Sequence, residues 1–177
     1  ILDKYDINFT FNKRKNGFAA NSNSALSLAM RLNKNSKVSM NVMCNDDVRV
    51  TPGWLEGMYK ALNTPAIFLQ SSPNPVLVEK YGKIGIVGPV SDNVSGIQRV
   101  MLPDAEGIPQ NELFKIDGSE ILRSFAQKNR LHNTGKVLSC DFLVGFCMAL
   151  SPECMKDLCG DTNKKRPMLF DEYFGKG

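Results

Sequence analysis

Side chains that often mark a catalytic or metal centre are scarce in this sequence. His132 is the single histidine and lies in a polar stretch without an acidic or cysteine neighbour, so we assign it no catalytic role. The five cysteines form no C-x-x-C pair, and a structural zinc site would therefore lack ligands at the usual spacing. A run of about 18 apolar residues, which a membrane-spanning helix would need, does not occur. The pattern favours reduced thiols in a reducing compartment.

Charge is modest and evenly spread along the chain. Lys and Arg number 22 and Asp and Glu 18, which gives a net charge of +4 at pH 7. The basic residues are too scattered to indicate nucleic-acid binding, but the charge suits a phosphorylated ligand or an anionic membrane face. The 177 residues, 42% of them hydrophobic, can bury the core of one soluble domain spanning 1–177. We expect a cytoplasmic protein, with peripheral association at the inner membrane face as an option.

Four segments have the apolar spacing that is typical of helices. The first begins at Asn21, behind Asn and Ser residues suited to capping. The second has Thr51 as N-cap and places Trp54 on its apolar face, where core packing is favoured over sugar stacking. The third covers 117–129, and the fourth is short, with Ser151 as N-cap and a proline at its first position.

Apolar runs bounded by Gly, Pro and other turn residues predict strands between these helices. They cover 38–44, 84–87 and 137–150, the last being one long strand or a pair. Because strands and helices alternate along the chain, we predict an α/β sheet with helices on its faces.

Two adjacent carboxylates, Asp46 and Asp47, directly follow the strand predicted at 38–44. The carboxyl ends of strands in open α/β sheets are where ligands usually bind. A divalent cation would relieve the repulsion between the two carboxylates, and Mg²⁺ or Mn²⁺ prefers such hard oxygen ligands together with substrate phosphates. A plain turn or capping role is the alternative, and the pair alone does not decide between the two.

Five stretches, in this order and rough spacing, resemble family 2 glycosyltransferases of the GT-A fold and span most of the chain. They are NGFAANSNSAL (16–26), MCNDDVRVTPGWLEGM (43–58), IGIVGPVSDNVSGIQ (84–98), CDFLVGFCMALSPECM (140–155) and LFDEYF (169–174). Each stretch is weak by itself, and the specific signal is their order, with Pro-Gly-Trp-Leu after the acidic pair. The resemblance implies a GT-A (Rossmann-like) mixed sheet with helices on both faces, present as a partial domain.

The activity that the resemblance implies is inverting transfer of a hexosyl or deoxyhexosyl group. A nucleotide-sugar donor would give this group to a hydroxyl of a glycan or lipid-linked acceptor, with Mg²⁺ or Mn²⁺ as cofactor. The family's acidic motif is often written Asn-x-Asp, which puts Asn45 and Asp47 at its outer positions. Asp47 is then the expected metal ligand, while Asn45 belongs to the donor site and Asp46 faces the donor ribose or sugar.

The same resemblance implies roles for four further residues. Asn23 matches an Asn that helps to shape the donor pocket, with a helix cap or turn as the alternative. Gly145 matches a glycine whose backbone comes close to the transferred sugar, with a strand bulge as the alternative. Asp171 and Glu172 match acidic residues near the acceptor, and either is a fallback for the catalytic base.

The match leaves out both ends of the family's domain. The strand, helix and strand that hold the nucleotide base would precede residue 1, and the Glu-Asp pair that supplies the catalytic base would follow Gly177. We therefore expect 1–177 to be a fragment, or to receive these parts from another segment. One rival is a sugar-phosphate nucleotidyltransferase, which would need a Gly-rich, basic phosphate-binding loop that we do not find. The other is a catalytically inactive carbohydrate-binding or scaffold domain.

Overall fold

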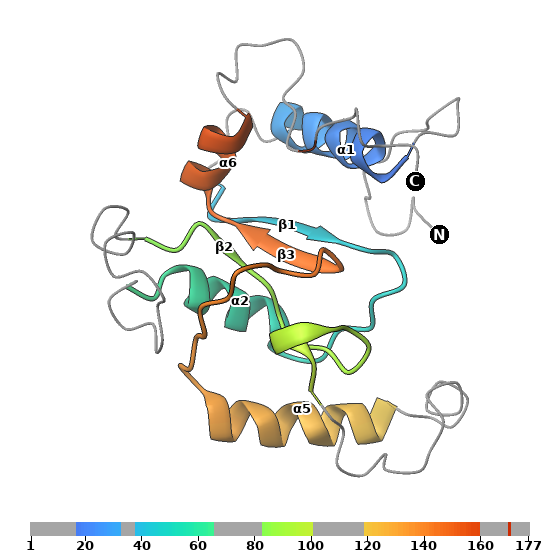
Figure 1. The fold of residues 1–177 in the computed structure, drawn as a ribbon, viewed down its shortest axis with the longest axis vertical. Helices are drawn as coiled ribbons and strands as arrows, with labels where there is room; N and C mark the ends of the chain where they lie inside the picture. The colour runs from blue at the N-terminus through green and yellow to red at the C-terminus, as the bar shows by residue number, and fades with distance from the viewer. Residues whose placement is uncertain (1–16, 33–37, 66–82, 101–118, 160–169, 171–177) are drawn as a thin grey trace. The chain divides into compact units, whose positions relative to one another are not determined.

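The structure is a computed structural model that describes residues 17–32, 38–65, 83–100, 119–159 and 170 (Figure 1). The chain divides into two compact units. The first combines Ile1–Asn41 with Ser151–Gly177, and the second is Val42–Leu150. This division into compact units does not test the prediction that 1–177 is one domain.

A small sheet of three strands lies at the centre of the second unit. Its order is β1 (Asn41–Cys44), β3 (Cys147–Leu150) and β2 (Ile86–Val87). β2 and β3 are antiparallel, with Ile86 opposite Leu150 and Val87 opposite Ala149. The arrows of β1 and β3 also point in opposite directions (Figure 1). The predicted α/β class is confirmed in the coarse sense that helices and a sheet are both present. The described strands are antiparallel, and the mixed sheet of the GT-A fold stays a prediction.

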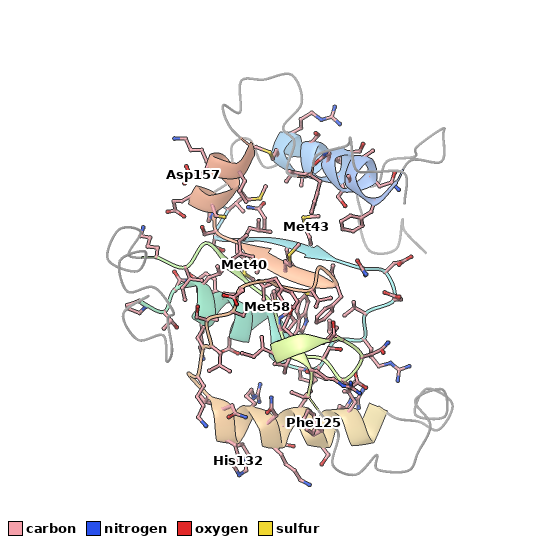
Figure 2. All side chains as sticks on the ribbon, in the orientation of Figure 1. Met40, Met43, Met58, Phe125, His132 and Asp157 are labelled. Carbon is pink, nitrogen blue, oxygen red and sulfur yellow. The ribbon has the colours of Figure 1, made fainter. Side chains whose placement is uncertain are left out.

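Helix α2 (Trp54–Leu62) packs against β2 and β3 in the second unit. Met58 and Leu62, one helical turn apart, are buried there, and Ala149 of β3 is fully buried as well. Figure 2 labels Met58 beside the sheet. Leu55, which lies on the same predicted apolar stripe, is 44% exposed, so the packed face of α2 is narrower than its sequence suggests.

The first unit contains α1 (Phe18–Leu32) and α6 (Pro152–Cys159). At the start of α6, the Cys154 amide donates a hydrogen bond of 3.1 Å to the hydroxyl of Ser151. This confirms Ser151 as N-cap and Pro152 as the first helical residue, where a missing amide hydrogen costs no helical bond. Among the helices of the described residues, none combines the length and the apolar character needed to cross a membrane.

Two predicted helix starts are wrong. α1 begins at Phe18 rather than near Asn21, so the Asn and Ser residues expected as caps lie inside the helix. α2 begins at Trp54, and Thr51 does not cap it. Gly53 has a φ of 79°, a left-handed conformation that glycine adopts at little cost, and the Trp54 amide donates to the Thr51 carbonyl at 3.2 Å. A turn therefore replaces the predicted first helical residues.

The third helix and all three strands also differ from their predictions, and β1 covers only Asn41–Cys44 of the predicted 38–44. α5 (Ser119–Asn133) extends beyond 129, so His132 lies in its last turn rather than in a loop and projects into solvent (Figure 2). In the predicted strand 137–150, only Cys147–Leu150 is a strand, and in 84–87 only Ile86–Val87. The described strands are therefore shorter than the apolar runs that predicted them.

Candidate functional site

The acidic pair lies on an exposed turn at the end of β1. The strand ends at Cys44, and Asn45, Asp46 and Asp47 follow it with exposed side chains. Extended backbone therefore delivers both carboxylates to one end of the sheet, and the turn leaves them open to solvent. This is the position at a strand end that the sequence predicted for them.

A backbone hydrogen bond brings a second predicted site segment to this turn. The Asn45 amide donates to the Phe146 carbonyl at 2.9 Å, and Gly145 directly precedes Phe146 in the turn that leads into β3. Asn45 and Gly145, far apart in the sequence, are thus held at the same end of the sheet. The candidate site is defined here as Asn45, Asp46, Asp47 and Gly145.

Gly145 is not required by the packing of the protein. A Cβ atom at this position would meet one atom within 4 Å, the terminal carbon of Met148 at 3.9 Å, which is an ordinary van der Waals contact. Gly145 is also exposed and lies in a turn rather than in a strand, so the alternative of a strand bulge is wrong. The backbone at Gly145 is therefore open to a molecule that approaches from solvent.

Gln98, which the sequence did not single out, supports the segment just before Gly145. It lies in the short helix η3 (Gly96–Gln98) and is 4% exposed. The Val144 amide donates to its Oε1 at 2.6 Å, and its Nε2 donates to the Pro89 carbonyl at 2.9 Å. The side chain thereby joins the chain after β2 to the chain before β3, in place of strand pairing. A buried Gln in a Gly-Ile-Gln turn has no distinctive sequence signal.

Gly88, in contrast to Gly145, is enclosed by this arrangement. A Cβ atom there would lie 2.8 Å from Gln98 Nε2 and 3.2 Å from Leu143 Cδ2. Because the Gln98 amide is already bonded on both sides, it cannot move away without losing a hydrogen bond. The two glycines therefore form a matched pair, one needed for packing and one not.

An open depression of about 600 Å³ lies at the start of α2. Its lining consists of the residues from Val50 to Glu56 together with Arg123, and includes Trp54, which is half-buried. The candidate site residues are not among the lining residues, although Asp47 precedes Val50 by three positions. The depression therefore adjoins the site along the chain without containing its carboxylates.

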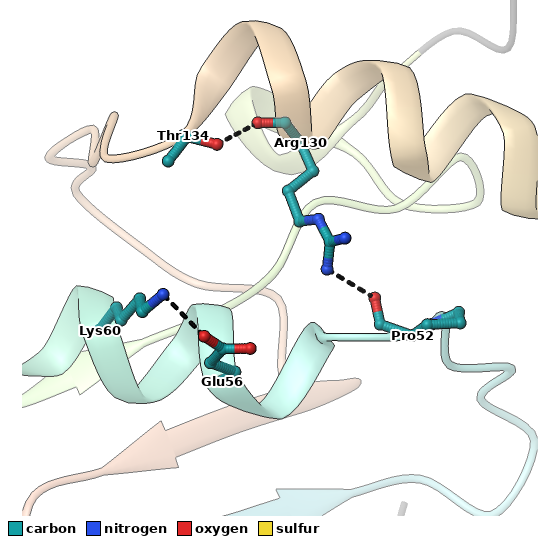
Figure 3. Close-up of polar contacts among 5 residues, drawn as sticks. All are labelled: Pro52, Glu56, Lys60, Arg130 and Thr134. Carbon is teal, nitrogen blue, oxygen red and sulfur yellow. Dashed lines mark hydrogen bonds and ion pairs between the residues drawn. The ribbon is translucent and has the colours of Figure 1, made fainter.

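Polar contacts hold α2 and α5 beside this depression (Figure 3). Arg130 Nη1 donates to the Pro52 carbonyl at 3.4 Å, and the Thr134 hydroxyl donates to the Arg130 carbonyl. Within α2, Lys60 Nζ lies 2.7 Å from the Glu56 carboxylate, one turn away. The Lys60 hydrogen bond and charge lower the pKa of Glu56. Only the Arg130–Pro52 bond joins the two segments, and because all these groups are exposed the contacts add little to stability.

Asn23 is fully buried in the middle of α1 and does not cap a helix. Its Nδ2 donates to the Phe170 carbonyl at 2.8 Å, and the Phe170 amide donates to its Oδ1 at 3.0 Å. The alternative of a cap or turn role is therefore wrong. Phe170 directly precedes Asp171 and Glu172, which lie outside the described residues.

The divalent cation predicted at the acidic pair stays a prediction. Among the side chains that the structure describes, no group of three or more His, Cys, Asp and Glu residues gathers to hold a metal. Mg²⁺ is usually held by one or two carboxylates, with water and substrate phosphates completing its coordination. Asp46 and Asp47, both exposed on the turn, are side chains of this chemical type.

Comparisons with known proteins give no family or relative for the chain. A scan against protein-family models, a search of curated proteins and a search of solved structures each found no match.

Proposed function

We propose that this chain is a GT-A-like domain of an inverting, metal-dependent glycosyltransferase. The donor is a nucleoside diphosphate sugar, and the acceptor is a hydroxyl of a glycan or a lipid-linked glycan. Asp47 holds Mg²⁺ or Mn²⁺, Asn45 and Asp46 bind the donor, and the Gly145 backbone adjoins the transferred sugar. Asn23 acts from α1 by holding the chain at Phe170.

The observation that supports this proposal most is the hydrogen bond between the Asn45 amide and the Phe146 carbonyl. The resemblance to family 2 glycosyltransferases implies one donor site for Asn45–Asp47 and Gly145. The hydrogen bond joins these two segments at one end of the sheet. The open surroundings of Gly145 and the exposure of both carboxylates add to this support.

In the proposed transfer, the acceptor oxygen forms a bond to the anomeric carbon of the sugar. The bond between that carbon and the diphosphate oxygen breaks, and the hydroxyl proton passes to a carboxylate. Asp171 and Glu172 are the candidates for this base within the chain. The divalent cation, when bound, stabilises negative charge on the departing diphosphate. Asp47 would contribute by holding the positively charged cation beside the phosphates.

Product analysis distinguishes this function from its two rivals. A version of the chain extended at both ends, so that it includes the expected base-holding segment and Glu-Asp pair, would be incubated with Mn²⁺ and either a panel of nucleoside diphosphate hexoses or a nucleoside triphosphate and a hexose phosphate. A glycosyltransferase releases a nucleoside diphosphate, in a reaction that requires Mn²⁺ and is lost in Asp47→Ala. Release of pyrophosphate from the second mixture would instead identify a nucleotidyltransferase. Binding of the hexose donor without either product would favour an inactive carbohydrate-binding domain.

A further inference from the structure

Two cysteines face each other beside the candidate site, but they differ in their access to solvent. Cys44 is the last residue of β1 and is exposed, whereas Cys147 is the first residue of β3 and is 1% exposed. Both belong to the second unit. In the described part of the chain no disulfide is present, and both side chains are thiols.

The register of the sheet places these two residues directly opposite each other. The Asn45 amide donates to the Phe146 carbonyl, and β1 and β3 run in opposite directions. In an antiparallel ladder, a bond from the residue after Cys44 to the residue before Cys147 flanks a non-hydrogen-bonded pair formed by Cys44 and Cys147. Directly opposite side chains of such a pair project from the same face of the sheet.

This register suits a disulfide without backbone movement. The Cα atoms of a non-hydrogen-bonded antiparallel pair are about 4.5 Å apart. Disulfides span Cα separations of about 4.4–6.8 Å. The two side chains also interact. The pKa of Cys147 is raised to about 12, first by burial and then by the charge and hydrogen bond of Cys44.

We propose that Cys44 and Cys147 are a modification site that forms a reversible disulfide between β1 and β3. Cys44 is the thiol that a dissolved oxidant reaches, and Cys147 is the shielded partner that closes the bond. This proposal rests on the sheet register and does not depend on the proposed function.

The oxidant is a small-molecule disulfide, with glutathione disulfide as the probe. The Cys44 sulfur, as thiolate, attacks one sulfur of glutathione disulfide, and one glutathione leaves as thiolate and takes up a proton. The Cys147 sulfur then attacks Cys44 Sγ, and the second glutathione leaves as thiolate and takes up the proton that Cys147 gives up. Two protein thiols and one glutathione disulfide thus give one protein disulfide and two glutathione thiols. Reduced glutathione in excess reverses both steps.

Mass spectrometry of the whole folded chain treated with glutathione disulfide tests this inference. The disulfide lowers the protein mass by two hydrogen atoms and links the tryptic peptides 38–49 and 137–156. Fragmentation must place the link at Cys147, because the second peptide also contains Cys140 and Cys154. We expect Cys44→Ser, which changes an exposed side chain, to abolish the link, and Cys140→Ser to leave it unchanged.

Two other results would overturn the proposal. One is a link from Cys44 to Cys140 or Cys154, which would show that the strand register does not select the partner. The other is a product that stops at the glutathione adduct of Cys44, or no product at all, while iodoacetamide still alkylates Cys44. Hydrogen exchange gives a second readout, because a disulfide next to Asn45 should slow exchange of the Asn45 amide, and reduction should restore its rate.

Discussion

The side chain of Asn23 binds both backbone polar groups of Phe170. Its amide donates to the Phe170 carbonyl at 2.8 Å and accepts from the Phe170 amide at 3.0 Å. The Phe170 ring also meets the Phe18 ring edge-on, with centroids 5.2 Å apart. One buried amide at the centre of α1 thereby fixes the residue that precedes Asp171 and Glu172.

Removing this amide should destabilise the first unit. Asn23→Ala leaves the carbonyl and amide of Phe170 without their partner, and we expect the free energy of unfolding to fall by about 1–3 kcal/mol. Urea denaturation followed by circular dichroism measures this change. Arg31→Ala, at an exposed position of the same helix, is the control and should change stability by less than about 0.5 kcal/mol. Equal stability of Asn23→Ala and the parent chain would show that the Phe170 contact is not maintained.

The buried amide of Gln98 should be equally sensitive to substitution. Gln98→Met keeps the approximate volume but leaves the Val144 amide and the Pro89 carbonyl unpaired, so we expect a loss of about 1–3 kcal/mol in unfolding free energy. Ile97→Ala provides the comparison, because Ile97 is the neighbouring residue of η3 and is 53% exposed. If Gln98→Met costs no more than Ile97→Ala, the Gln98 hydrogen bonds do not hold the segment before Gly145.

The two contrasting glycines separate packing from ligand binding. Gly88→Ala should destabilise the fold by about 1–3 kcal/mol, because the new methyl group collides with Gln98 and Leu143. Gly145→Ala should leave unfolding free energy nearly unchanged but weaken Mn²⁺-dependent binding of a nucleotide sugar. The two measurements are thermal unfolding and fluorescence of Trp54, the single tryptophan. Unaltered donor binding by a folded Gly145→Ala chain would contradict the role proposed for the Gly145 backbone.

Stability should depend on the Cys147 thiol in a way that changes with pH. Burial and then the Cys44 thiol raise the pKa of Cys147 from 9.0 to about 12, so the folded chain holds this proton more tightly than the unfolded chain. The contribution of Cys147 is complete below pH 9.0 and is lost as the pH rises through 12. We therefore expect the stability difference between the parent and Cys147→Ala to shrink from neutral pH to about pH 10.5.

Urea unfolding of both chains at the two pH values measures this dependence. Cys140→Ala is the control for other groups that titrate in this range. It removes a thiol that is only half-buried, so the pH dependence should change less than in Cys147→Ala. A difference that stays constant or grows above pH 9.0 would contradict the raised pKa.

Local patterns predicted the existence of elements better than their ends. The start of α6 was predictable because Ser151 and Pro152 carry the chemistry of a cap and a first turn within two residues. The start of α2 was missed because Thr-Pro is a common beginning of a helix. The left-handed conformation of Gly53, which makes the helix begin at Trp54 instead, is not visible in the local sequence. The role of Asn23 inside α1 was likewise not visible locally, because its partner, Phe170, lies far away in the sequence.

The candidate site shows the same division between local and distant information. A strand end followed by two carboxylates is a local signal, and the turn at Asp46 and Asp47 follows it. The length of the strand before Gly145 was overestimated because apolar character alone cannot reveal that Gln98 binds the Val144 amide. The register that sets Cys44 opposite Cys147 was also invisible in the sequence, since it depends on pairing between segments far apart in the chain.

The central claim, that Asp47 binds a divalent cation for a nucleoside diphosphate, is tested most directly by isothermal titration calorimetry. The chain would be titrated with uridine, guanosine and thymidine diphosphates, with Mn²⁺ and with excess chelator, as the parent, Asp47→Ala and Asp157→Ala. Asp157 is an exposed carboxylate of α6 and serves as the matched control. We predict Mn²⁺-dependent binding of at least one diphosphate by the parent and Asp157→Ala, and none by a folded Asp47→Ala. Equal Mn²⁺-dependent affinity in Asp47→Ala and the parent, or no binding by the parent, would contradict the account.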